Sequence, residues 1–172
     1  MTTPHPSDNP SDNNAWEYEH PQDLDTATDE AAPISEPSAV NSLIAIYSGK
    51  AHVNGFLNGY AQYGTHSDLG VRIAYASVER IPPGIQGLIA GNETDPLVLA
   101  TLAASPFTHP AVISVLAALE PTPEYAPVVL AAVSNPCMET DLLTYFTYSG
   151  SLAVSATAKM KLAQRFRGDN IV

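Results

Sequence analysis

The chain has 172 residues and is strongly acidic, with 18 Asp or Glu against 7 Lys or Arg and a formal net charge of −11. This charge disfavours nonspecific binding to nucleic acid, and the length suits one domain with an additional flank. The apolar stretches are interrupted by Pro and Glu well short of the ~18 residues that a membrane helix requires. The single cysteine, Cys137, excludes an intramolecular disulfide, and the N-terminus is polar. We therefore expect a cytoplasmic protein with neither a membrane nor nucleic acid as a partner.

Residues 1–40 contain nine acidic residues, six prolines and no Lys or Arg. Such a segment cannot bury enough apolar surface to offset its ordering entropy, so we predict a disordered acidic tail. Its Trp16 and Tyr18 form an isolated aromatic pair. An aromatic pair in a disordered chain is either an anchor that folds on binding a partner or inert, and both interpretations stay open.

Residues 41–68 are predicted to form an atypical helical cap before the more regular part of the chain. Gly55, Gly59 and Gly64 alternate with aromatic residues, which is compatible with a close-packed helix or with an aromatic binding face. The segment also contains His52, His66 and Asp68. Their spacing is not typical of a metal site, so we predict no metal or cofactor. A small enzyme or metal-binding protein that uses the His52 to Asp68 region is the alternative hypothesis.

Residues 69–172 are predicted to be all-α, in short helices that begin at cap residues such as Asp95 before Pro96 and Thr122 before Pro123. Four helical stretches open on valines, at spacings of 27, 30 and 26 residues: Val71, Val98, Val128 and Val154. A second apolar helix follows each of the first three. Units this short must stack to share a core, which predicts a helical solenoid, although an irregular bundle has a similar pattern.

The strings LATLAASPFTHPAVISVLA and LAAVSNPCMETDLLTYFT resemble the leucine-rich repeat variant family over about Leu69 to Phe166. The resemblance implies a right-handed superhelix that alternates α-helices with short, often 3₁₀, helices. The sequence departs from the family pattern at Glu79-Arg80 and at an insertion over Leu119 to Ala126. Some family members hold an iron–sulfur cluster on upstream cysteines, but Cys137 lies inside a repeat, so no cluster is expected.

No catalytic constellation is recognisable: Cys137 has neither a base nor a cationic residue near it in the sequence to activate its thiol, and we predict no enzyme activity. The C-terminal stretch carries four basic residues, which are either a solvated face or a site for an anionic partner: Lys159, Lys161, Arg165 and Arg167. The sequence thus predicts a noncatalytic protein-protein interaction module of unidentified partner, which binds through the helical surface, and the acidic tail is a candidate second contact. Leu116 and Leu142 are predicted to lie in the shared core.

Overall fold

The computed structural model describes residues 36–52 and 55–168, which all belong to one compact unit, Ser35–Val172. These residues form α-helices and one π-helical turn and contain no strand, so the all-α prediction is confirmed for them. None of their helices is long and apolar enough to cross a lipid bilayer. The elements are α1 (Ala39–Tyr47), α2 (Phe56–Gly59), the turn η1 (Tyr60–Gly64), α3 (Leu69–Ala76), α4 (Pro83–Asn92), α5 (Pro96–Ala104), α6 (Pro110–Ala117), α7 (Ala126–Ser134), α8 (Thr140–Phe146) and α9 (Leu152–Gly168).

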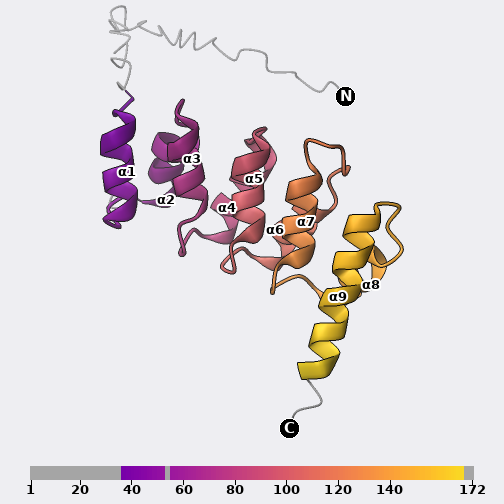
Figure 1. Ribbon diagram of the computed structural model, residues 1–172. Helices are drawn as coiled ribbons and strands as arrows, with labels where there is room; N and C mark the ends of the chain where they lie inside the picture. Colours follow the sequence, from indigo (N-terminus) through magenta and orange to yellow (C-terminus); the bar gives the residue numbers. More distant parts are fainter. Residues whose placement is uncertain (1–35, 53–54, 169–172) are drawn as a thin grey trace, which may run out of the picture. The chain divides into compact units, whose positions relative to one another are not determined.

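The odd-numbered helices α1, α3, α5, α7 and α9 lie side by side in chain order (Figure 1), and each packs against the next. The even-numbered helices α4, α6 and α8 lie behind this row (Figure 1). Helix α4 contacts α5 and α6, α6 contacts α5 and α7, and α8 contacts α9. The described unit is thus a row of helix pairs in which neighbours along the chain are also neighbours in space.

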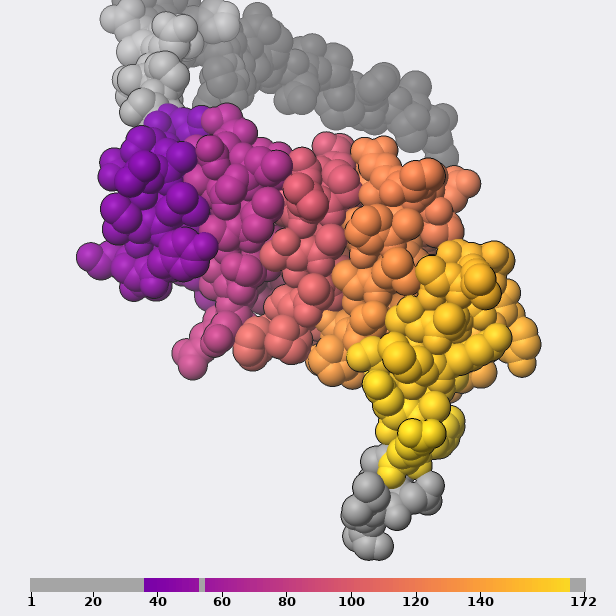
Figure 2. Space-filling model, viewed as in Figure 1, coloured from indigo at the N-terminus to yellow at the C-terminus, as the bar shows by residue number. Residues whose placement is uncertain are grey.

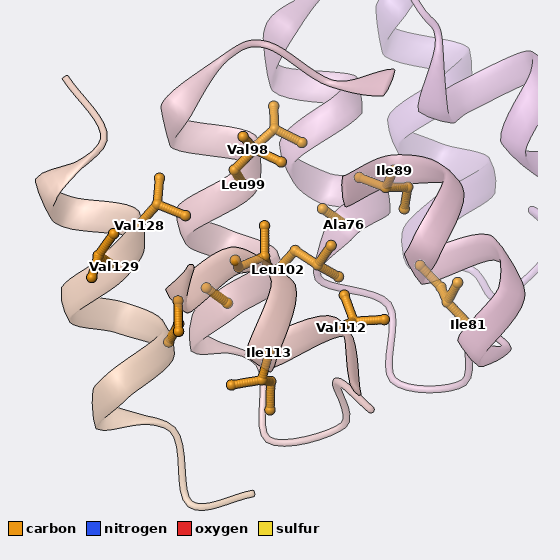
Figure 3. Packing of buried hydrophobic residues seen from close by; sticks show 14 of the residues in the cluster. Ala76, Ile81, Ile89, Val98, Leu99, Leu102, Val112, Ile113, Val128 and Val129 are labelled. Carbon is orange, nitrogen blue, oxygen red and sulfur yellow. The ribbon is translucent and has the colours of Figure 1, made fainter. Parts of the chain in front are cut away.

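The core follows the valine spacing of the sequence. Val71, Val98, Val128 and Val154 are each at most 1% exposed, and they occupy corresponding places near the starts of α3, α5, α7 and α9. Between α5 and α7, the side chains of Val98, Leu99, Leu102, Val128 and Val129 fill the same layer (Figure 3). Because one layer joins each helix to the next, the core is continuous along the row.

Polar side chains begin several of these helices. The Asp95 carboxylate accepts from the Leu97 amide at 2.8 Å, and Pro96 occupies the first turn, as predicted. The predicted start at Thr122 is displaced, because α7 begins only at Ala126 and the Thr122 hydroxyl accepts from the Tyr125 amide in the preceding loop. Pro127 has no amide to donate to the carbonyl of Pro123, so a helix that started at Pro123 could not continue past this point.

Two expectations from the sequence are corrected. The second helices α4, α6 and α8 are α-helical rather than 3₁₀, and each has seven or more residues. In the first turn of α6 the carbonyl of His109 accepts from the Val112 amide at 2.9 Å and from the Ile113 amide, four residues on, at 3.1 Å, and the second of these bonds is the α-helical one. The predicted tail boundary at residue 40 is also too late, because Ser38 caps α1 and the helix begins at Ala39. Residues 1–35 lie outside the described residues.

Gly59 shows why the 41–68 segment contains glycine. A Cβ atom at this position would lie 2.7 Å from the carbonyl oxygen of Ala51 and 2.8 Å from Nδ1 of His52. Both distances are too short for a real side chain, so only glycine lets α2 approach this loop. Phe56 and Tyr63 from the same segment pack into the core, although Leu57 is exposed.

Candidate protein-binding groove

A groove of about 650 Å³ opens between α6 and α8. It is lined by the end of α6, by residues 119–121, by α8 and by residues 148–151. Helix α4 packs directly on α6. Helix α8 does not pack on α6 in the same way, because the main neighbours of α6 are α4, α5 and α7. The groove therefore lies where one second helix fails to pack on the next.

The lengthened connection after α6 accounts for this gap. Helix α6 ends at Ala117, and the chain then runs through Pro121 and Pro123 before α7 begins at Ala126. The loop is fixed at its far end, where the Tyr125 hydroxyl donates to the carbonyl of Thr94 at 3.3 Å. Residues 119–121 then form one wall of the groove, so the insertion that interrupts the repeat pattern also shapes the groove.

Exposed aromatic side chains border the groove. Tyr145 is 72% exposed and Tyr148 is 86% exposed. The ring of Phe146 lies edge-on to that of Tyr145, with 5.5 Å between the ring centroids. Leu142 and Leu119 are half-buried in the same lining. Amphipathic rings of this kind supply most of the binding energy in many protein interfaces.

The charge of the groove is negative. Glu120 is the one ionisable carboxylate in its lining, and no Lys or Arg of the described residues lines it. Glu139 and Asp141 are exposed at the start of α8, which also lines the groove. An apolar segment with neutral or basic flanks fits this field better than an acidic segment does.

The predicted C-terminal basic residues lie on α9, outside the groove lining. Lys159 and Arg167 are exposed and Lys161 is half-exposed. Arg165 instead has a structural role: its guanidinium donates to the hydroxyl of Thr140 at 2.9 Å and to backbone carbonyls of the preceding turn, those of Pro136 and Met138. The structure thus ties α9 to the start of α8 through Arg165. The other two predicted partner-binding residues, Trp16 and Tyr18, lie outside the described residues.

The structure places His66 and Asp68 beside each other, whereas His52 packs against Phe56 and Tyr75. His66 Nε2 lies 2.9 Å from the carbonyl oxygen of Pro37, and Nδ1 accepts from the Asp68 amide at 3.0 Å. The Asp68 carboxylate in turn caps α3 by accepting from the Val71 amide. Across the described ranges, no group of three or more His, Cys, Asp or Glu is placed to hold a metal ion.

Around His66, a smaller polar cavity of about 320 Å³ includes Arg72 and Glu93. Arg72 Nε lies 2.9 Å from Glu93, and the same guanidinium donates to the carbonyls of His66 and Ser67. Hydrogen bonds from Ser67 lower the pKa of Glu36, which accepts from its amide and its hydroxyl. These groups are engaged with other protein atoms, so the α6–α8 groove is the stronger candidate site.

His52 stacks on aromatic rings. Its ring centroid lies 4.4 Å from that of Phe56 and 5.6 Å from that of Tyr75. Both ring nitrogens are buried without a hydrogen-bond partner, and burial lowers the pKa of His52. Burial also raises the pKa of the Tyr75 hydroxyl, so both groups are neutral at pH 7.

We expect this histidine to make stability depend on pH. An unfolded chain protonates His52 near pH 6.5, whereas the folded chain protonates it only at lower pH. The contribution of His52 to the free energy of unfolding is therefore at its highest above about pH 6.5, and it decreases as the pH falls from there through the folded pKa. Urea unfolding between pH 7 and pH 5 should show a smaller loss of stability in His52→Phe, which retains the stacking, than in the unsubstituted protein. Equal losses would contradict the assignment to His52.

The two groove tyrosines were not among the candidate residues predicted from the sequence, and neither was Gln86. The buried Gln86 carboxamide donates to the carbonyls of Ile81 and Phe107 and accepts from the His109 amide. Cys137 is half-buried, and its thiol donates to the carbonyl of Pro106. Gln86 thus connects α4 to the segment before α6, and Cys137 connects the segment before α8 to the segment before α6.

The comparisons with known proteins found no similarity: no protein-family model matches the chain, and neither do the curated proteins or the solved structures that were searched.

Proposed function

We propose that this chain is a noncatalytic, cytoplasmic protein-binding module, and that its groove between α6 and α8 holds a segment of a partner protein. The helix pairs are, in this proposal, leucine-rich-variant repeats stacked in a short right-handed solenoid. The observation that carries the proposal is the aromatic groove at the one lengthened connection between pairs, with Tyr145 and Tyr148 exposed beside it.

The energetics of the groove support a binding role. Exposed tyrosines with few internal contacts contribute little to folding, whereas covering them with a partner removes apolar ring surface from water at roughly 25 cal/mol per Å². Helices α6 and α8 flank the groove together with two short connecting segments, so a partner binds to a surface that is already formed. Tyr145 and Tyr148 are the residues on which we expect affinity to depend most.

The partner segment is defined by its chemistry. One apolar or aromatic side chain would enter between Leu142 and Leu119, and a flanking Lys or Arg would approach Glu120. The acidic residues 1–35 do not match this charge pattern. We assign them instead to a second, electrostatic contact with the partner.

A selection experiment tests the groove. A phage library of random peptides would be selected on the full chain, and binding of the enriched peptides would be measured by calorimetry. We expect peptides with an apolar anchor and basic flanks, and at least a tenfold weaker affinity for Tyr145→Ser/Tyr148→Ser. Because both side chains are exposed, this variant should retain its melting temperature.

Tyr47→Ser is the matched control, since Tyr47 is similarly exposed but lies on α1. It should bind the selected peptides as the unsubstituted chain does. Peptides that bind the groove variant with unchanged affinity would contradict the proposal.

A further inference from the structure

Helix α1 is apolar on two faces and carries no charged residue. On one face, Leu43 and Ile46 pack into the core. On the other face, Val40 is 66%, Ile44 is 61% and Tyr47 is 77% exposed. At 100° per residue, the spacing of these three side chains places them within about 60° of one another, so they form a single stripe, the α1 stripe.

Such a stripe is unusual at the end of a helical row. A surface helix normally has a polar outer face, and the terminal units of stacked helices are usually capped by polar residues. Helix α1 is the first helix of the row and packs mainly on α3 (Figure 1; indigo in Figure 2). Its outer face therefore has the composition of an internal helix that has a neighbour on both sides.

The charges at the two ends of α1 indicate which neighbour fits. Glu36 lies just before the helix, and the preceding 35 residues contribute eight further acids and no Lys or Arg. Lys50 lies just after the helix and is exposed. A second α1 in the antiparallel direction brings each Lys50 toward the acidic end of the other copy. A parallel second copy would place like charges together.

We propose that α1 of a second copy covers the α1 stripe, in an antiparallel pair with twofold symmetry. In such a pair the two Ile44 side chains contact each other near the symmetry axis, and Val40 of one copy lies opposite Tyr47 of the other. The same α1 stripe then forms both sides of the interface, and no second surface is needed. The stripe is much smaller than the roughly 800 Å² per partner of a stable interface, so the dimer is weak and forms with rising concentration.

Sedimentation velocity on the full chain, from micromolar to millimolar concentrations, tests the pairing. We expect a monomer–dimer equilibrium whose dissociation constant rises at least tenfold in Ile44→Glu. Leu152→Glu is the matched control: Leu152 is 84% exposed on α9, the helix at the other end of the row, and its substitution should leave the equilibrium unchanged. A chain that stays monomeric throughout, or a dimer that Leu152→Glu disrupts while Ile44→Glu does not, would overturn the proposal.

Disulfide formation tests the direction of the pair. In a Cys137→Ser background, Ile44→Cys should cross-link to itself on mild oxidation, because the Cβ atoms of a disulfide lie only ~3.8 Å apart. A mixture of Val40→Cys and Tyr47→Cys chains should give mainly the mixed dimer. Self-linked Val40→Cys as the main product would show a parallel pair and contradict the proposed geometry.

Discussion

We expect Leu116→Ala to lower the free energy of unfolding by about 2 to 5 kcal/mol. Leu116 in α6 is fully buried, and its helix contacts α4, α5 and α7. Truncation of its side chain therefore leaves a cavity, which would close only if α4, α5 and α7 all shifted. Urea unfolding followed by circular dichroism measures this loss.

Val115 provides the control within the same helix. It is more than half exposed, so Val115→Ala should change stability by no more than about 0.5 kcal/mol. If the two substitutions had equal effects, the assigned inward face of α6 would be wrong. In α8, Leu143→Ala should resemble Leu116→Ala, because Leu143 is fully buried and the predicted core residue Leu142 is only half-buried.

Asn135→Ala should cost about 3 kcal/mol, because the carboxamide of Asn135 joins two successive helix pairs. Its Nδ2 donates to the carbonyls of Ala103 at 2.7 Å and Ser105 at 2.8 Å, while its Oδ1 accepts from the Cys137 amide at 2.8 Å. Asn135 is only 3% exposed, so alanine leaves these backbone groups without a partner. Each buried polar group left unsatisfied costs about 1 to 3 kcal/mol.

Asn92→Ala controls for the loss of an exposed carboxamide. Asn92 Nδ2 also donates to a backbone carbonyl, that of Leu88, but water can replace that bond. Its truncation should cost less than about 1 kcal/mol. Equal denaturation midpoints for the two variants would show that Asn135 does not join the helix pairs.

The buried valines at the helix starts were predictable because their spacing is a local, periodic signal. Val98 is the third residue of α5 and Val128 is the third residue of α7, and both side chains are buried in corresponding places. The helix start at Asp95 was predictable for a similar reason, since a carboxylate followed by proline satisfies the first turn by itself. Features that depend only on neighbours in sequence could therefore be predicted.

Features that depend on contacts between residues far apart in the sequence could not be predicted. Gln86 bonds to the backbone of Phe107 and His109, more than twenty residues away, and no local pattern marks it. Arg165 had the appearance of a surface charge, yet its hydrogen bonds go to residues 25 to 29 positions earlier. In Leu142-Leu143, adjacent leucines in a seven-residue helix leave the inward face ambiguous, which explains the shift by one residue.

The groove was predictable only in part. The insertion over Leu119 to Ala126 was visible in the sequence, but its consequence was not, because the separation of α6 from α8 depends on packing. Tyr145 belongs to a stretch that had the pattern of a second apolar helix, so its exposure was not expected. The long connection between α6 and α7 locates this site better than the residue types do.

Amide chemical-shift mapping of the full chain with a selected peptide tests the proposed function most directly. We predict that the largest shifts fall on the residues that line the groove, which are residues 117–121, 142, 145–146 and 148–151. Small shifts are expected on α9 and around the cavity near Arg72 and Glu93. Shifts concentrated on α9 or on that cavity, with the groove residues unchanged, would contradict the assignment of the groove as the binding site.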